Sequence, residues 1–537
     1  MVQGKKKIAI YIIASLIAAA ICVISFGKSV MDPTNMNLYY KWGDGMQHYY
    51  GWMAFRNSPW KFPLGLFDGV TYPDATSIIF TDSLPWLAIL FKLLSPILPW
   101  NFQYFGIWAI FCYVMMAILI VKILSDYTQN PIMLLASVVM MSYISSVIIR
   151  QFSHEALGGQ WILLLAWDLF LDIYKNKATK KLVAKSALIG FLASGTHIYF
   201  LPMCGIILVG GMVLDFLKNK EKLRPIVLLG TYLCVVVLSV WILGGFSSGT
   251  EIVNEEFIYG NMANLNTLWN PVTYSAFFKG LGLYSQGQDD GSAYLGLGFF
   301  FVIACDLVLI LWNRKKAKHQ QKEKVLVIPL VAIFVMTLWF STYPLVCYGE
   351  KILFSTKLPG IVDQLMSVFR CCGRAAWVVS FGIMIFSFIL LCRENKRLIS
   401  IFLIVAALLQ GLDVQPVISK KYTEIHEENE QAVTFSNAPE LLEAVAEGKY
   451  KHVVIHDELN SFAALFVASW AIEHHMTVNT FYLARSDEAA YEKRLEEALL
   501  DLEDDTLYLF SPDDRKTAES YGLTVICEDD GILVTGR

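Results

Sequence analysis

The chain has 537 residues, of which 55% are hydrophobic and only 17% are charged, and its mean hydropathy is +0.49. Soluble domains carry about a quarter charged residues, whereas the apolar residues here come in runs of about twenty, enough to cross a ~30 Å hydrocarbon core. These values exclude an ordinary cytosolic enzyme, a secreted disulfide scaffold and a disordered chain, and they predict an α-helical polytopic membrane protein.

The net charge of −4 conceals an asymmetry between two parts of the chain. From Val414 onward, 25 acidic residues accompany 10 basic ones, whereas residues 1–413 contain 22 acidic and 33 basic residues. We therefore expect a basic transmembrane domain, 1–413, followed by an acidic domain, 414–537. The ten cysteines show no spacing typical of a zinc site or a disulfide framework.

The basic N-terminus precedes an apolar run from Ile8 to Phe26. No convincing small-residue cleavage site follows this run, so we interpret it as an uncleaved first span. Eleven runs in all are candidate spans: 8–26, 103–122, 131–149, 156–174, 182–197, 199–217, 225–244, 293–312, 325–344, 374–392 and 398–413.

A twelfth apolar run, 84–98, is short and is interrupted by Pro85, Lys92 and Pro96. If it does not span and the N-terminus is cytoplasmic, 21 basic residues fall on short cytoplasmic segments, as the positive-inside rule requires. We therefore expect 84–98 to lie along the outer face as an amphipathic or half-buried helix.

This topology gives three long outer loops, 27–83, 245–292 and 345–373, and places the tail outside the cytoplasm. Functional groups commonly lie on loops that a rigid scaffold positions, so we expect the chemistry on the outer face. In the tail, apolar stretches at 451–456, 477–484, 505–510 and 523–529 predict strands, and 461–475 and 487–500 predict helices. That alternation predicts a small α/β domain.

Asp44, in the first outer loop, is the leading catalytic candidate. It lies between Gly43 and Gly45 in an aromatic-rich stretch, where a carboxylate could act as a general base. The alternative is a Gly-Asp-Gly turn that caps the helix starting near Met46. His48 is four residues further on and could share a helix face with Asp44, as part of a metal or proton-relay pair or as a hydrogen-bonded surface histidine.

Further ionisable residues lie where spans emerge on the outer side. Arg150, His154 and Glu155 follow the third predicted span and either face a cavity or snorkel at the interface. His197, in a tight outer turn, is either a structural residue or a phosphate contact. Desolvation of charged groups at this depth costs free energy unless they face each other or a cavity, so both turns are candidate binding sites.

Arg370 and Arg374 precede the tenth predicted span with i, i+4 spacing. Their guanidinium groups suit a lipid phosphate at headgroup level, and interfacial anchoring is the alternative. Tyr294 follows a DDG sequence at 289–291 that we interpret as a turn rather than a divalent-ion site. Asp168 and Asp172 require only a pairing or snorkelling role, whereas the sequence offers no role for Asp306.

One span, a long acidic outer loop, a non-spanning helix and a span pair leading to a charged turn together resemble the GT-C glycosyltransferases. The likeness covers about 1–413 and is closest to protein O-mannosyltransferases, the bacterial aminoarabinose transferase and, in detail, a bacterial GT-C-like membrane protein family of uncharacterised function. The stretches that carry the detailed likeness are GDGMQHYYGW, TDSLPW, SHEALGGQW and YLGLG.

The resemblance implies an inverting transferase that uses a polyprenyl-phosphate sugar on the outer face of a bacterial plasma membrane. It implies Asp44 as the base and Arg150, His154, Glu155 and His197 as outer-turn site residues. Many GT-C members have two adjacent acids in the first loop, whereas Gly45 follows Asp44 here, so no metal ligand is assigned and a divalent cation stays open as cofactor.

The expected partners are the lipid-linked sugar, the bilayer and a cell-envelope acceptor that is a glycan, lipid or protein; no nucleic acid is expected. With Asp44 as base, the expected substrate- and phosphate-binding residues are His48, Arg150, His154, Glu155, His197, Tyr294, Arg370 and Arg374. The alternatives are a lipid or polysaccharide transporter or flippase, and a non-catalytic envelope scaffold. Transporters tend to show internal repeats and broken midplane helices, which this sequence lacks.

Overall fold

The structure is a computed structural model. It describes residues 2–41, 43–247, 260–313, 324–356, 360, 366, 368–394, 396–427, 433–456, 461–485 and 488–537. Most of the basic segment 313–324 and parts of the predicted loops 245–292 and 345–373 therefore lie outside the described residues.

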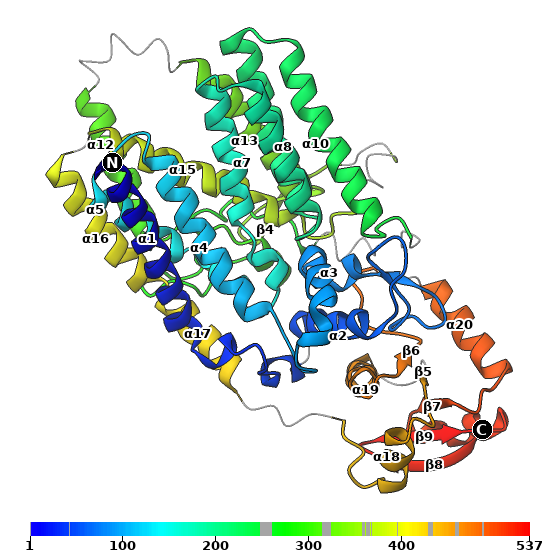
Figure 1. Ribbon diagram of the computed structural model, residues 1–537. Helices are drawn as coiled ribbons and strands as arrows, with labels where there is room; N and C mark the ends of the chain where they lie inside the picture. The colour runs from blue at the N-terminus through cyan, green and yellow to red at the C-terminus, as the bar shows by residue number, and fades with distance from the viewer. Residues whose placement is uncertain are drawn as a thin grey trace.

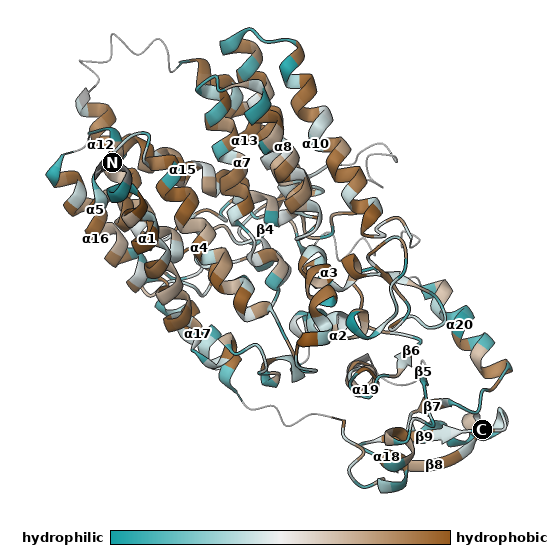
Figure 2. Ribbon diagram, in the orientation of Figure 1, coloured by the Kyte–Doolittle hydropathy of each residue, from teal (hydrophilic) through white to brown (hydrophobic). Residues whose placement is uncertain are grey.

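A bundle of long helices forms the larger part of the molecule (Figure 1), and hydrophobic residues dominate these helices (Figure 2). Within it, α1 packs against α4 and α5, α7 against α9, α8 against α10, and α12 against α16. The bundle helices are α1 (Val2–Phe26), α4 (Phe105–Leu124), α5 (Pro131–Ser142), α6 (Ser145–Arg150), α7 (Trp161–Tyr174), α8 (Thr179–Ser194), α9 (Phe200–Leu214), α10 (Leu223–Ile242), α12 (Leu297–Asn313), α13 (Val327–Thr342), α15 (Ala376–Glu394) and α16 (Arg397–Asp413).

The prediction of a multi-pass helical membrane protein is confirmed. In the described part of the chain, seven helices are long and apolar enough to cross a membrane, and eight if α16 and α17 (Gln415–His426), which meet at a 45° bend, count as one span. The three other predicted spans correspond to α5, α8 and α12, which have 12, 16 and 17 residues. For these three, spanning stays a prediction.

The predicted span over 131–149 is not one continuous helix, because the helix breaks between α5 and α6. Asn130 begins α5 by accepting a hydrogen bond from the Ile132 N–H at 3.0 Å. At the break, the buried Gln410 amide donates to the carbonyl oxygen of Tyr143 at 3.0 Å. A backbone group freed within a bundle needs such a partner, so a side chain from α16 stabilises the break.

The run 84–98 forms the short helix α3 (Pro85–Leu94) and one further turn, η4 (Ser95–Ile97), as expected for a segment that does not span. One face is buried, whereas Leu93 and Ile97 are exposed. Lys92 belongs to the buried face, and its ammonium lies 4.1 Å from the ring centre of Phe55 and 4.7 Å from that of Trp60. The aromatic faces thus offset the cost of burying this cation.

Acidic residues inside the bundle are mostly paired. Asp168 and Asp172 on α7 both bind Lys185 of α8, which confirms the pairing role predicted for them. Asp306 on α12 is buried, and neither carboxylate oxygen has a hydrogen-bond partner among the described residues.

Several short elements connect the bundle helices at the end where α2 (Asp44–Asn57) and α3 lie, which we call the site end (Figure 1). They are η1 (Ser29–Met31), η2 (Asn37–Tyr40), β1 (Leu66–Phe67), β2 (Thr76–Ser77), η3 (Ile78–Thr81), η5 (Glu155–Gly158), η7 (Gln286–Gly291), β3 (Leu345–Tyr348), β4 (Lys351–Ser355) and η10 (Cys372–Ala375). Strands β1 with β2, and β3 with β4, form antiparallel pairs.

The chain ends in a small α/β unit beside the site end (Figure 1), which confirms the predicted α/β class. Its sheet has the order β6-β5-β7-β9-β8. Strands β6, β5 and β7 are parallel to one another, and β9 is antiparallel to both of its neighbours, β7 and β8. The elements are α18 (Pro439–Ala446), β5 (His452–Ile455), α19 (Ser461–Glu473), β6 (Thr477–Val478), α20 (Glu488–Leu500), β7 (Thr506–Phe510), α21 (Arg515–Ser520), β8 (Thr524–Asp529) and β9 (Ile532–Gly536).

The membrane orientation that we predict from the sequence, with the C-terminal domain outside the cytoplasm, implies opposite labelling of two exposed positions. We expect a cysteine at Asp513→Cys in the C-terminal domain to react with a membrane-impermeant maleimide on intact cells. A cysteine at Lys220→Cys, on a lysine-rich connector at the other end of the bundle, should react only after the membrane is permeabilised. The parent chain gives the background from its own thiols. Labelling of Lys220→Cys alone on intact cells would reverse the orientation.

Candidate functional site

A cavity of about 270 Å³ lies at the site end of the bundle. Its walls include residues from all three long loops and from both short turns that the sequence identified. Five predicted site residues line it: Asp44, His154, His197, Arg370 and Arg374. Functionally relevant lining residues that were not singled out are Gln47, Asp82, Asn261, Tyr482 and Arg485, and Asp290, interpreted from the sequence only as part of a turn, lines the cavity as well.

Helix α2 places Asp44 on the cavity. Gly43, with a φ of +129°, turns the chain into the helix at a conformation that other residues avoid. Asp44 is then the first helical residue, where the positive end of the helix dipole favours a carboxylate. Burial raises the pKa of Asp44 despite the nearby positive charges of His48, Arg374 and Arg150. A carboxyl group with a raised pKa suits proton transfer near neutral pH.

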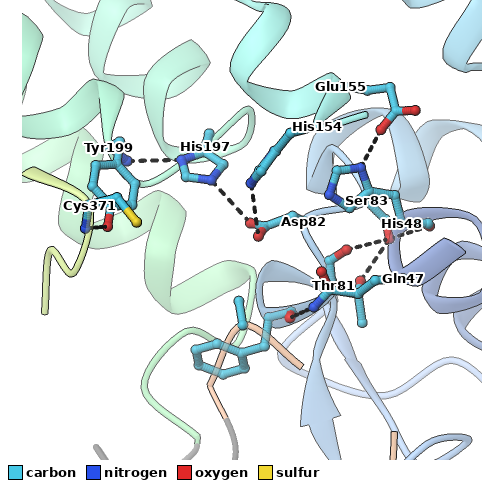
Figure 3. Close-up of polar contacts among 12 residues, drawn as sticks. Gln47, His48, Thr81, Asp82, Ser83, His154, Glu155, His197, Tyr199 and Cys371 are labelled. Atoms are coloured by element: carbon cyan, nitrogen blue, oxygen red, sulfur yellow. Dashed lines mark hydrogen bonds and ion pairs between the residues drawn. The ribbon is translucent and has the colours of Figure 1, made fainter. Parts of the chain in front are cut away.

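His48 lies one turn along the same helix and is fully buried behind the cavity wall. Its Nδ1 is hydrogen-bonded to a carboxylate oxygen of Glu155 (Figure 3). Burial alone would lower the pKa of His48, but the Glu155 carboxylate outweighs burial and raises it. The Nε2 atom has no hydrogen-bond partner among the described residues, so it is available for an interaction that the protein alone does not supply.

Asp82 projects from the end of η3 into the cavity, with its backbone in the left-handed region at φ +51°. The segment that carries it packs directly on α2: a Cβ at Gly51 would lie 2.4 Å from that of Thr81. Next to Asp82, the Ser83 hydroxyl donates to the carbonyl oxygen of His48 at 2.7 Å. Burial raises the pKa of Asp82 to about 6.

Two histidines converge on Asp82 (Figure 3). Nε2 of His197 lies 3.5 Å and Nε2 of His154 lies 3.9 Å from a carboxylate oxygen of Asp82. These distances are longer than good hydrogen bonds. Burial lowers the pKa of both histidines well below the usual value, so both are neutral at pH 7. Neutral imidazoles keep a lone pair and can coordinate a cation.

A second group of cavity residues depends on Asp290, which binds two guanidinium groups. Its Oδ2 accepts from Nε of Arg374 at 2.5 Å, and its Oδ1 accepts from Nη2 of Arg150, also at 2.5 Å. Burial would raise the pKa of Asp290, but the two arginines hold it well below its usual value. The DDG sequence lies in the turn η7, as the sequence predicted. The turn interpretation did not include the second role of Asp290, which is the counter-ion of two arginines.

The remaining predicted residues lie outside the cavity lining. Glu155 and Arg150 stand behind it, since they bind His48 and Asp290. Tyr294 is buried elsewhere and donates to Oδ2 of Asp413 at 2.8 Å, next to the start of α12. The structure therefore gives Tyr294 a supporting role at a helix end and does not bring it together with the other site residues.

Two lining residues, Tyr482 and Arg485, come from the C-terminal domain: Tyr482 from the predicted strand 477–484 and Arg485 from the position directly after it. Sequence reasoning missed them because strand β6 ends at Val478 and the chain then leaves the sheet toward the cavity. Asp82 could have been identified from the sequence more readily than Tyr482 or Arg485, because it is an acidic residue in a long predicted outer loop, directly before the run 84–98.

Three groups near Asp44 fit a divalent cation. His48, Asp82 and His154 each offer one ligand atom, and these atoms lie within 4.8 Å of one another. The Nε2 atom of His48 is buried without a hydrogen-bond partner among the described residues, and Nε2 of His154 faces Asp82 at 3.9 Å. Glu155, on the other nitrogen of His48, is the kind of partner that orients a metal-binding imidazole. Two nitrogens and one carboxylate suit a first-row transition metal.

Comparison with known proteins gives a family match over most of the chain. The family model DUF6311, a domain of unknown function, matches residues 15–415, and the model of the DUF6311 C-terminal domain matches residues 441–535. No curated protein matches the chain.

Two similar solved structures are oligosaccharyltransferase chains from the archaeon Archaeoglobus fulgidus. One, AglB in complex with an inhibitory peptide and a dolichol-phosphate, is 12% identical with a TM-score of 0.42; the other, tethered to an acceptor peptide, is 11% identical with a TM-score of 0.43. Each match covers 95% of this chain and 70% of the other. Both are membrane transferases of the GT-C class that the sequence resembles, but similarity this low carries no argument about function.

Replacing Asp290 tests the charge cluster. We expect Asp290→Asn to lower the free energy of unfolding by about 3–5 kcal/mol, because two buried guanidinium groups lose their counter-ion. Thermal unfolding of the protein in detergent measures the change. Asp289→Asn is the matched control, since its amide oxygen still accepts from the Tyr274 hydroxyl that binds Asp289. Equal stability of the two variants would show that Asp290 is not needed as a counter-ion.

Metal titration tests the histidine–aspartate group. We expect Mn²⁺ to bind the purified protein, and His48→Ala and Asp82→Asn each to weaken binding at least tenfold, as measured by calorimetry. His475→Ala, in the C-terminal domain, should bind as the parent does. Unchanged affinity in both site variants would contradict the assignment.

Proposed function

We propose that this chain, which belongs to the DUF6311 family, is a GT-C-type membrane glycosyltransferase that transfers a sugar from a polyprenyl-phosphate donor to a cell-envelope acceptor. The observation that carries the proposal is the composition of the cavity: the carboxylates of Asp44 and Asp82, which no arginine among the described residues binds directly, share one space with Arg370, Arg374 and Arg485. Transfer from a lipid phosphate needs a base for the acceptor and positive charge for the departing phosphate.

The cavity brings residues for the two requirements together in one space. Asp44 lies with the neutral histidines near α2, whereas Arg374 lies beside Asp290. Two guanidinium groups share the Asp290 carboxylate, so this buried cluster keeps one net positive charge. A phosphate group at the cavity would balance that charge at short range, where the low local dielectric makes the attraction strong.

The proposed reaction is a single displacement. Asp44 accepts the proton of an acceptor hydroxyl or amine, whose oxygen or nitrogen forms a bond to the anomeric carbon. The bond between that carbon and the phosphate oxygen breaks, and the polyprenyl phosphate leaves with the electron pair, stabilised by Arg374 and Arg370. One displacement inverts the anomeric centre. A divalent cation held by His48, Asp82 and His154 would add Lewis-acid stabilisation of the donor phosphate.

The position of the cavity favours a transferase over a transporter. Transporters bind substrate near the bilayer midplane, where each side has access in turn. Here the cavity lies at one end of the bundle, between loops and the C-terminal domain. Such a place suits a donor whose phosphate is at headgroup level and an acceptor that arrives from the aqueous phase.

Replacement of Asp44 tests the proposal. We expect the purified protein in nanodiscs to turn over polyprenyl-phosphate hexoses, and Asp44→Asn to lower kcat by at least about 100-fold while donor affinity changes by no more than a few fold. Asp68→Asn is the control, because Asp68 lies in the same loop and pairs with Lys61 outside the cavity.

Equal turnover by the parent and Asp44→Asn would remove Asp44 from catalysis. If the parent turned over no donor in the panel, the glycosyltransferase proposal would fail, and transport or scaffolding would become the better explanation.

A further inference from the structure

The C-terminal domain contacts the membrane body through a segment that we call the strap, residues 478–485. Main-chain hydrogen bonds join the strap to the first outer loop at both ends. The Tyr72 N–H donates to the Val478 carbonyl at 2.8 Å, and the Val478 N–H donates to that of Gly69 at 3.0 Å. Near the other end, the Ala484 N–H donates to the carbonyl oxygen of Phe80 at 2.7 Å. The strap thus follows the loop that carries Asp82.

Side chains reinforce this attachment next to the catalytic candidate. The Tyr50 hydroxyl on α2 donates to Oε1 of Glu473, at the end of α19, at 2.6 Å. Arg494 on α20 forms an ion pair with Asp74 at 3.0 Å. Helix α2 therefore carries Asp44 at its start and a docking contact with the C-terminal domain less than two turns later.

The strap ends at the cavity, where two arginines join it to the third outer loop in a reciprocal way. The Arg370 guanidinium donates to the carbonyl oxygen of Ala484, and the Arg485 guanidinium donates to that of Val368. Both arginines line the cavity. The C-terminal domain is therefore part of the cavity wall, and its strap is held in place from two sides.

Tyr482 is the aromatic residue that the strap brings to this wall. Its side chain keeps 46% of its surface exposed, so the cavity is not filled by the ring. Asp44 and Asp82 line the same cavity as Tyr482, so the ring and both carboxylates share one space. An aromatic face beside carboxylate acceptors matches a hexose, whose C–H face packs on a ring while its hydroxyls donate to oxygens.

We infer that Tyr482 is a specificity-determining residue, whose ring packs against the sugar of the bound polyprenyl-phosphate donor. The inference rests on the proposed function and adds that the C-terminal domain recognises the transferred group. Loop residues of the membrane domain, with Arg374 among them, then recognise the phosphate. The C-terminal domain thus supplies the aromatic contact to the sugar, and the membrane domain supplies the carboxylates that accept from the sugar hydroxyls and the arginine that binds the phosphate.

Binding measurements with two probes test this division. We expect Tyr482→Ala to weaken binding of a polyprenyl-phosphate hexose about tenfold and to leave binding of bare polyprenyl phosphate unchanged. Tyr482→Phe should bind both lipids as the parent does, because the ring is kept. Tyr482→Leu should behave like the alanine variant, because it restores apolar bulk without an aromatic face. Tyr521→Ala, at another exposed tyrosine of the same domain, is the matched control.

The outcomes distinguish failure of the inference about Tyr482 from failure of the proposed glycosyltransferase function. Equal loss of both lipids in Tyr482→Ala would show a general effect on the cavity and overturn the role of Tyr482, and so would a parent-like Tyr482→Leu. Turnover by the parent together with either result would leave the proposed function in place. If the parent bound neither lipid, both proposals would fail.

Discussion

The Asp290 carboxylate joins three parts of the chain that are far apart in sequence. It lies in the turn η7 and binds Arg150 at the end of α6 and Arg374 near the start of α15. Because an unpaired charge in a protein interior costs several kcal/mol, displacement of the turn η7 would leave two guanidinium groups without their counter-ion. The cavity lies beside this cluster and shares Arg374 with it, so the position of its cationic wall depends on a contact that needs no ligand.

The part of the cavity around Asp44 differs from the Asp290 cluster in its hydrogen bonding. Around Asp44, buried polar atoms are left without partners: Nε2 of His48 and Nδ1 of His154 have none among the described residues. In most folded proteins such atoms are satisfied, and where they are not, a missing ligand is a direct explanation. Unpartnered nitrogens on two neighbouring imidazoles favour a binding site over a purely structural charge network.

Local patterns predicted the membrane class, the non-spanning helix and the α/β tail, because run length and alternation act within a few turns of chain. Local patterns also identified Asp44, His154, His197, Arg370 and Arg374. Ionisable groups close to apolar helices lose hydration energy unless they are paired or face a cavity, so they stand out in the sequence. Partners far away in sequence decided the rest. The break after α5 depends on Gln410, 267 positions beyond the carbonyl that it binds. Tyr294, predicted at the site, instead binds Asp413.

The strap described above holds the C-terminal domain to the first outer loop chiefly through backbone groups. Backbone hydrogen bonds form whatever side chains the residues carry. Relatives could therefore exchange the side chain at position 482 for another without losing the docked geometry. The docking of the domain and the choice of sugar are separable traits, and evolution can alter the second at a single codon while the first is inherited intact.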